Sequence, residues 1–136
     1  MTDKLTEIET PQWMLDLFKA IDSLDMSATS GINILDQNIV MQFGPKTVHG
    51  LEDVKKFFVK LDEPFITRHL VARVFRFGDA YLMQGSAELR KKSDPSGPTI
   101  SAAPLFNLLW FNEKGKVMRY VVDFPPQAAA QSDAFD

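Results

Sequence analysis

The chain has 136 residues, of which 45% are hydrophobic and 24% charged, proportions typical of one folded domain with a real core. Its net charge of −3 and pI near 5.3 argue against a nucleic-acid partner, which requires a clustered basic face. The absence of cysteine excludes disulfides, thiolate catalysis and cysteine-ligated metals. The polar first residues and the lack of a long apolar run predict a cytoplasmic protein, with no signal peptide and no membrane span.

The first half of the chain predicts two amphipathic helices separated by a pair of strands. Thr10 is expected to cap the first helix, in which apolar residues recur at three- and four-residue spacing. A short strand is predicted over residues 38–43, and residues 46–49 are expected to pair with it. The second helix is predicted to begin at Gly50 and to stop at Pro64.

From residue 67 the hydrophobic period changes to two, which predicts strands. Residues 69–77 and 80–90 are expected to form a hairpin around the tight-turn signal Gly78-Asp79. Residues 102–111 and 116–124 are expected to form a second hairpin. The second half of the chain is therefore predicted to be a sheet of long antiparallel strands.

This order of elements predicts a single α+β domain over residues 1–126. Its helices are expected to pack on the concave side of a curled antiparallel sheet. Residues 127–136 form a tail with no visible role, which is expected to be disordered or packed against a neighbour. The open face of the sheet predicts self-association as a homodimer.

Three short motifs, one on the first helix and two on strands, carry a resemblance to a known family. The motifs are Ile21-Asp22-Ser23-Leu24-Asp25, Thr67-Arg68-His69-Leu70 and Phe106-Asn107-Leu108-Leu109-Trp110. Together with the order of elements, they resemble the SnoaL-like branch of the nuclear transport factor 2-like (NTF2-like) superfamily, and within it the scytalone dehydratases most of all. The resemblance covers residues 13–125 and implies a cone-shaped fold and a homotrimer.

The resemblance implies an Asp–His dyad, in which Asp22 orients His69 as the catalytic acid/base. It also implies that Asn107 binds a substrate carbonyl or hydroxyl. Ile21 and Phe43 stand where this family has tyrosines, and its second active-site histidine has no counterpart here, so the pocket is expected to be more apolar. From residue type alone, His69 could instead be an ordinary strand-end histidine, Asp22 a helix-terminating residue and Asn107 an amide satisfied by backbone.

Asp123, on the last predicted strand, is a candidate second acid or base; the alternative is an ion pair with Arg119 or Arg73. Two isolated histidines without metal-ligand spacing predict no metal site, and the lack of a Gly-rich phosphate loop predicts no nucleotide cofactor.

Several further residues are candidates either to line a substrate cavity or to fill a core. They are Met41, Phe43, Phe58, Leu61, Leu105 and Trp110.

These residues together predict a cofactor-independent acid/base enzyme. It is expected to act as a dehydratase, isomerase or cyclase on a small hydrophobic substrate, such as a polyketide or terpenoid intermediate. One alternative is a non-catalytic NTF2-like module that binds a small ligand or a partner protein. Another is an epoxide hydrolase, in which Asp22 and Asp123 would flank a water molecule.

Overall fold

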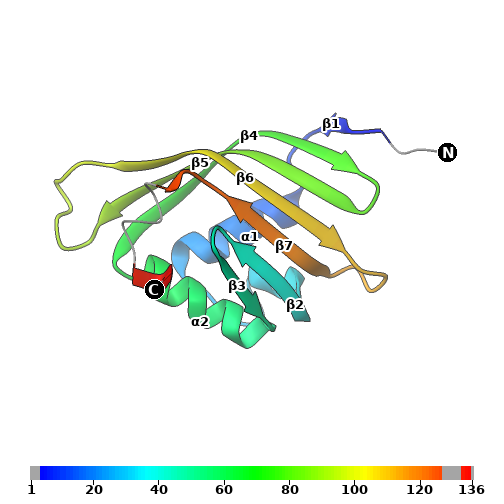
Figure 1. Ribbon diagram of the computed structural model, residues 1–136, viewed down its shortest axis with the longest axis horizontal. Coiled ribbons are helices and arrows are strands. Elements are labelled where there is room, and N and C mark those ends of the chain that lie inside the picture. The colour runs from blue at the N-terminus through cyan, green and yellow to red at the C-terminus, as the bar shows by residue number, and fades with distance from the viewer. Residues whose placement is uncertain (1–3, 127–132, 136) are drawn as a thin grey trace.

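The computed structural model describes residues 4–126 and 133–135. A curled seven-stranded sheet, in the order β1-β4-β5-β6-β7-β2-β3, covers two helices that lie against its concave face (Figure 1). The α+β prediction is therefore confirmed. In chain order the elements are β1 (Thr6–Ile8), α1 (Gln12–Ser23), the 3₁₀ helix η1 (Gly31–Ile34), β2 (Leu35–Phe43), β3 (Lys46–His49), α2 (Leu51–Asp62), β4 (Phe65–Phe77), β5 (Ala80–Lys91), β6 (Ile100–Phe111), β7 (Val117–Asp123) and the 3₁₀ helix η2 (Asp133–Phe135).

The sheet is mixed, so the prediction of an antiparallel sheet is wrong for one pair. β2 runs parallel to β7, with Leu35 opposite Val117 and Phe43 opposite Val122, whereas the other neighbouring strands are antiparallel. Short turns reveal the antiparallel β4–β5 and β6–β7 pairs in the sequence, and Gly78 in the β4–β5 turn has a φ of 58°, which favours glycine. No turn joins β2 to β7, because about seventy residues separate them.

The two helices bury the apolar stripes that their sequences predict. Only the cap of α1 differs from the prediction: Pro11, not Thr10, precedes the helix, and no side chain caps its amino end. The buried residues of the helices are Met14, Leu17, Phe18, Ala20 and Ile21 in α1 and Val54, Phe57, Phe58, Leu61 and Asp62 in α2. The buried face of α2 also includes one charged residue that was not predicted, Asp62.

The amino-terminal strand β1 was not predicted, because three residues are too few to show an alternating pattern. β1 pairs with the edge of β4, where Thr6 lies opposite Arg76. An exposed ion pair joins the two strands, with Arg73 Nη2 2.7 Å from Glu7 Oε1.

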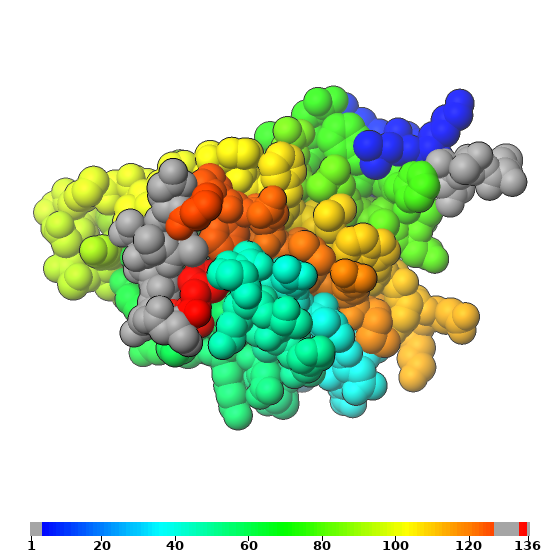
Figure 2. Space-filling model, in the orientation of Figure 1, coloured from blue at the N-terminus to red at the C-terminus, as the bar shows by residue number. Residues whose placement is uncertain are grey.

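Part of the predicted carboxy-terminal tail is folded against the domain. Ala134 in η2 is buried, and the ring of Phe135 packs against Phe43, Phe57 and Phe124, with ring centroids 5.8 to 6.0 Å apart. In Figure 2, residues 133–135 (red) lie beside the β2–β3 hairpin and the end of β7. The rest of the predicted tail, residues 127–132 and 136, lies outside the described residues.

Within residues 4–126 and 133–135, neither α-helix has the length and apolar character needed to cross a membrane.

Candidate active site

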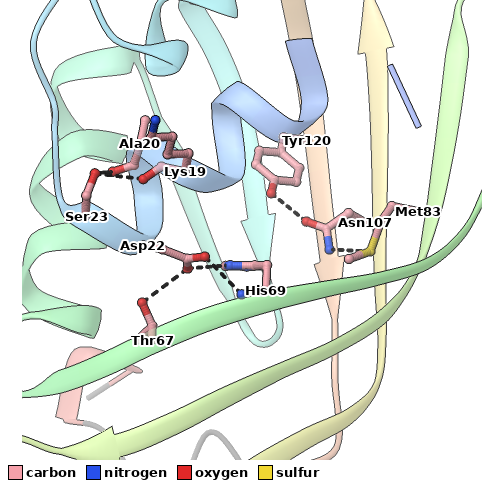
Figure 3. A network of polar contacts seen from close by, with 9 residues as sticks. All are labelled: Lys19, Ala20, Asp22, Ser23, Thr67, His69, Met83, Asn107 and Tyr120. Atoms are coloured by element: carbon pink, nitrogen blue, oxygen red, sulfur yellow. Dashed lines mark hydrogen bonds and ion pairs between the residues drawn. The ribbon is translucent and has the colours of Figure 1, made fainter. Parts of the chain in front are cut away.

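Asp22 and His69, 47 positions apart in the chain, are in direct contact (Figure 3). Oδ1 of Asp22 lies 2.6 Å from Nδ1 of His69. The backbone N–H of His69 donates to Oδ2 of Asp22 at 2.9 Å, and the Thr67 hydroxyl donates to Oδ1 at 3.2 Å. The carboxylate therefore joins the end of α1 to the start of β4 and receives three hydrogen bonds there.

Local structure at both elements brings these side chains together. α1 ends at Ser23, and Leu24 follows in the left-handed conformation with a φ of 54°. Asp22 is thus in the last turn, next to the buried residue Ile21. On β4, residues 67 and 69 share one face of the strand because side chains alternate. Both Thr67 and His69 consequently meet the same carboxylate.

The contacts of Asp22 determine which nitrogen of His69 is free. Burial of Asp22 raises its pKa, but the hydrogen bonds and charge of His69, together with Thr67, outweigh burial and hold the pKa below its ordinary value of 3.8. Asp22 is therefore ionised at neutral pH and only accepts hydrogen bonds, so Nδ1 of His69 must carry the hydrogen. Nε2 makes no hydrogen bond with any described residue. Phe18 stacks on the imidazole with ring centroids 4.7 Å apart, which restrains the orientation of the ring.

His69 belongs to the wall of a cavity of about 60 Å³ that lies between the helices and the sheet. The wall is mostly apolar, and none of its described residues is a lysine or an arginine. Four of the six predicted lining residues are in it: Phe43, Phe58, Leu61 and Leu105. Met41 is fully buried elsewhere in the core, and Trp110 packs beneath the guanidinium of Arg119.

Asn107 is fully buried behind the wall of the cavity rather than in it. Its Oδ1 accepts a hydrogen bond from the Tyr120 hydroxyl at 2.5 Å, and its Nδ2 donates to Met83 Sδ at 3.6 Å (Figure 3). Of these two residues, Tyr120 rather than Asn107 lines the cavity. Burial raises the pKa of the Tyr120 phenol far above its ordinary value. Asn107 thus holds a neutral tyrosine hydroxyl in place at the cavity.

Tyr120→Phe is expected to destabilise the protein by about 1–3 kcal/mol, because the buried Oδ1 of Asn107 would lose its hydrogen-bond donor. Urea unfolding of the variant measures this loss. Tyr81→Phe is the matched control, since Tyr81 is only partly buried and its hydroxyl has no hydrogen bond in the described residues. Equal unfolding free energies for the two variants would contradict a structural role for the Tyr120–Asn107 bond.

The predicted second acid, Asp123, is exposed and lies outside the cavity wall. Val122 lines the cavity, so the next residue on β7 points to the other side of the sheet. Asp123 makes no ion pair with a described residue, since Arg73 pairs with Glu7 and Arg119 stacks on Trp110. Asp22 and Asp123 therefore do not share a site.

A different aspartate, Asp62, occupies the wall of the cavity and was not singled out from the sequence. It is the last residue of α2, is 5% exposed and makes no hydrogen bond with any described residue. Burial raises its pKa from 3.8 to about 7; the charge of His69 lowers it and that of Asp22 raises it. The sequence contains a signal for the burial of Asp62: it follows the buried Phe58 by four residues, about one helical turn, so both side chains lie on the same face of α2.

No group of three or more His, Cys, Asp or Glu side chains suited to a metal ion occurs in the described parts of the chain.

Neither a protein-family model nor a curated protein matches the sequence. Solved structures do match. A protein of ketosteroid isomerase-like fold from Catenulispora acidiphila, in complex with trimethylamine, has a TM-score of 0.75 and 12% identity over 94% of this chain and 96% of that one. A candidate SnoaL-like polyketide cyclase from a Jannaschia species has a TM-score of 0.71 and 17% identity over 95% and 98%. An LEH-like epoxide hydrolase from M. tuberculosis has a TM-score of 0.69 and 11% identity over 88% and 85%. These likenesses confirm the predicted NTF2-like fold.

Proposed function

We propose that this protein is a cofactor-independent acid/base enzyme that transfers protons on a small, mostly apolar carbonyl compound. The observation that supports it best is the 2.6 Å contact between Nδ1 of His69 and Asp22. This contact leaves Nε2, the second nitrogen of a histidine in the cavity wall, without a hydrogen-bond partner, and an imidazole that carries hydrogen on Nδ1 alone can accept a proton there.

The first chemical step follows from that free nitrogen. Nε2 of His69 removes a proton from the carbon next to a substrate carbonyl, and Asp22 stabilises the imidazolium that forms. The carbonyl oxygen takes up the electron pair as an enolate, so this step requires no cofactor. Dehydration, isomerisation and cyclisation can all begin this way, and the structural likeness to a candidate polyketide cyclase supports chemistry of this class.

The size of the cavity favours one alternative, the binding of a small ligand without catalysis. Its volume of about 60 Å³ is less than half of the roughly 150 Å³ of an engineered apolar cavity that holds benzene. A small amine would suit a wall with several phenylalanines and with Asp62, whose carboxyl ionises above about pH 7. The similar protein from Catenulispora acidiphila was solved with trimethylamine, which supports this alternative.

Hydrogen–deuterium exchange of small ketones tests the enzyme proposal without knowledge of the natural substrate. Butanone and cyclopentanone are incubated with the protein in D₂O, and loss of their α-protons is followed by ¹H NMR. The wild type is expected to accelerate the exchange, and His69→Gln to lower that acceleration by about 10²–10⁴-fold, the usual contribution of a positioned base. His49→Gln, which removes an exposed histidine, is the control and is expected to leave the acceleration of exchange unchanged. If His69→Gln exchanges as fast as the wild type, His69 is not the base.

A further inference from the structure

We propose that Asp62 is the proton donor of this site, and that the site acts on uncharged carbonyl compounds. The inference rests on the proposed function, because it supplies the acid that complements the base His69. It also replaces the acid that the sequence suggested, Asp123, which is exposed outside the cavity.

The hydrogen bonds of the wall single out Asp62. Four polar side chains line the cavity: Asp62, Thr67, His69 and Tyr120. The Thr67 hydroxyl donates its hydrogen to Asp22, and the Tyr120 hydroxyl donates its hydrogen to Asn107. Two groups in the described wall are left without a hydrogen-bond partner, the carboxyl of Asp62 and Nε2 of His69. One of them is an acid and the other a base.

The surroundings of Asp62 keep a proton on its carboxyl at pH values up to about 7. Burial is the main cause and raises its pKa to about 7. Two neighbouring groups act on it: His69 from β4 lowers the pKa when its imidazole is protonated, and the charge of Asp22 from α1 raises it. Tyr120 from β7 is the other titratable side chain of the wall, and its phenol stays neutral. A carboxylic acid held in this way can donate a hydrogen bond and then a proton.

The charges around the cavity also restrict the substrate. Two carboxyl groups, those of Asp22 and Asp62, act on the site, and no described wall residue is a lysine or an arginine. An anionic substrate would lose its hydration and gain no cationic partner, so binding it would be costly. A neutral ketone or hydroxyketone carries no such cost.

On a β-hydroxyketone the two groups would complete a dehydration. Nε2 of His69 takes the proton from the carbon between the carbonyl and the hydroxyl-bearing carbon, and that electron pair forms the C=C bond. The C–O bond breaks as Asp62 gives its proton to the departing hydroxyl, which leaves as water. The imidazolium of His69 then returns its proton to the Asp62 carboxylate through the product water, and both groups regain their starting states.

The rates of two reactions distinguish the role of Asp62 as the acid from that of His69 as the base. Dehydration of diacetone alcohol, followed by ultraviolet absorbance of the enone, requires both the base and the acid. Exchange of the α-protons of cyclopentanone requires the base. Asp62→Asn is expected to lower dehydration by about 10²–10⁴-fold but exchange by less than about tenfold. The adjacent exposed control Glu63→Gln is expected to change neither rate. Wild-type dehydration is expected to fall as pH rises through about 7, where Asp62 loses its proton.

Three results would overturn the proposal for Asp62. The first is dehydration by Asp62→Asn at the wild-type rate, with exchange intact. The second is trimethylammonium binding that strengthens above pH 7 and is lost in Asp62→Asn, which would make Asp62 a ligand for a cation. The third is the absence of any exchange by the wild type, which removes the proposed function itself and with it the need for an acid.

Discussion

Asp62→Asn is expected to abolish a large pH dependence of the free energy of unfolding. Burial raises the pKa of Asp62 from 3.8 to about 7, so the folded state binds this proton more tightly than the unfolded state. The resulting stabilisation is fully present below about pH 3.8 and is lost as pH rises through about 7. At about 1.36 kcal/mol for each pH unit between these values, the loss in the wild type amounts to about 4 kcal/mol. Asparagine carries no titrating proton and loses nothing over this range.

Urea unfolding at several pH values between about 4 and 8 measures this effect. The unfolding free energy of Asp62→Asn minus that of the wild type is expected to grow by about 4 kcal/mol from the low to the high end of the range. The same difference for Glu63→Gln, whose side chain is exposed, is expected to stay nearly constant. Parallel curves for the wild type and Asp62→Asn would show that Asp62 titrates alike in the folded and unfolded states.

Asp22→Asn is expected to lower α-proton exchange by about 10²–10⁴-fold and the free energy of unfolding at pH 7 by about 1–3 kcal/mol. Three donors converge on the two oxygens of Asp22. An amide offers one oxygen and one NH₂ group, so at least one donor would face another donor. The lowered pKa of Asp22 means that its stabilisation is present above about pH 3.8 and is lost as pH falls below it.

Asp16→Asn is the matched control for this variant, because Asp16 is an exposed aspartate on the same helix. It is expected to change neither exchange nor stability by a comparable amount. An Asp22→Asn protein with wild-type exchange would contradict the role of the dyad, even if its stability fell.

The parts of the site that were predictable are those that depend on local patterns and on the family resemblance. Three motifs pointed to Asp22, His69 and Asn107, and the structure brings the first two into contact. The position of Asn107 behind the wall depends on its hydrogen bond with Tyr120 of β7. The hairpin of β6 and β7 was predicted, but the sequence pattern does not report which of their side chains bond to each other. The parallel pairing of β2 with β7 had no local signal, because no turn joins these two strands.

Asp123 was predicted to face the cavity, but the structure places Asp62 there instead. The error arose because the alternating pattern of a strand does not report which of its two faces points inward. Asp123 alternates with Val121 and Arg119, and that face of β7 is the one turned away from the cavity, whereas Tyr120 and Val122 face it. Asp62 continues the apolar stripe of α2, where a charged residue is usually taken as the end of the buried face. A charged residue at a buried position of a helix therefore indicates a candidate functional residue.

The central claim is that Asp22 holds His69 with hydrogen on Nδ1 and leaves Nε2 free in the cavity. ¹⁵N NMR of the imidazole of His69 at neutral pH tests it most directly, since a ring nitrogen that carries hydrogen and one that does not have well-separated chemical shifts. The geometry predicts that the neutral imidazole of the wild type carries its hydrogen on Nδ1 and not on Nε2, and that Asp22→Asn loses this single tautomer. A wild-type spectrum with hydrogen on Nε2 alone, or a mixture of tautomers that Asp22→Asn leaves unchanged, would contradict the dyad and the function built on it.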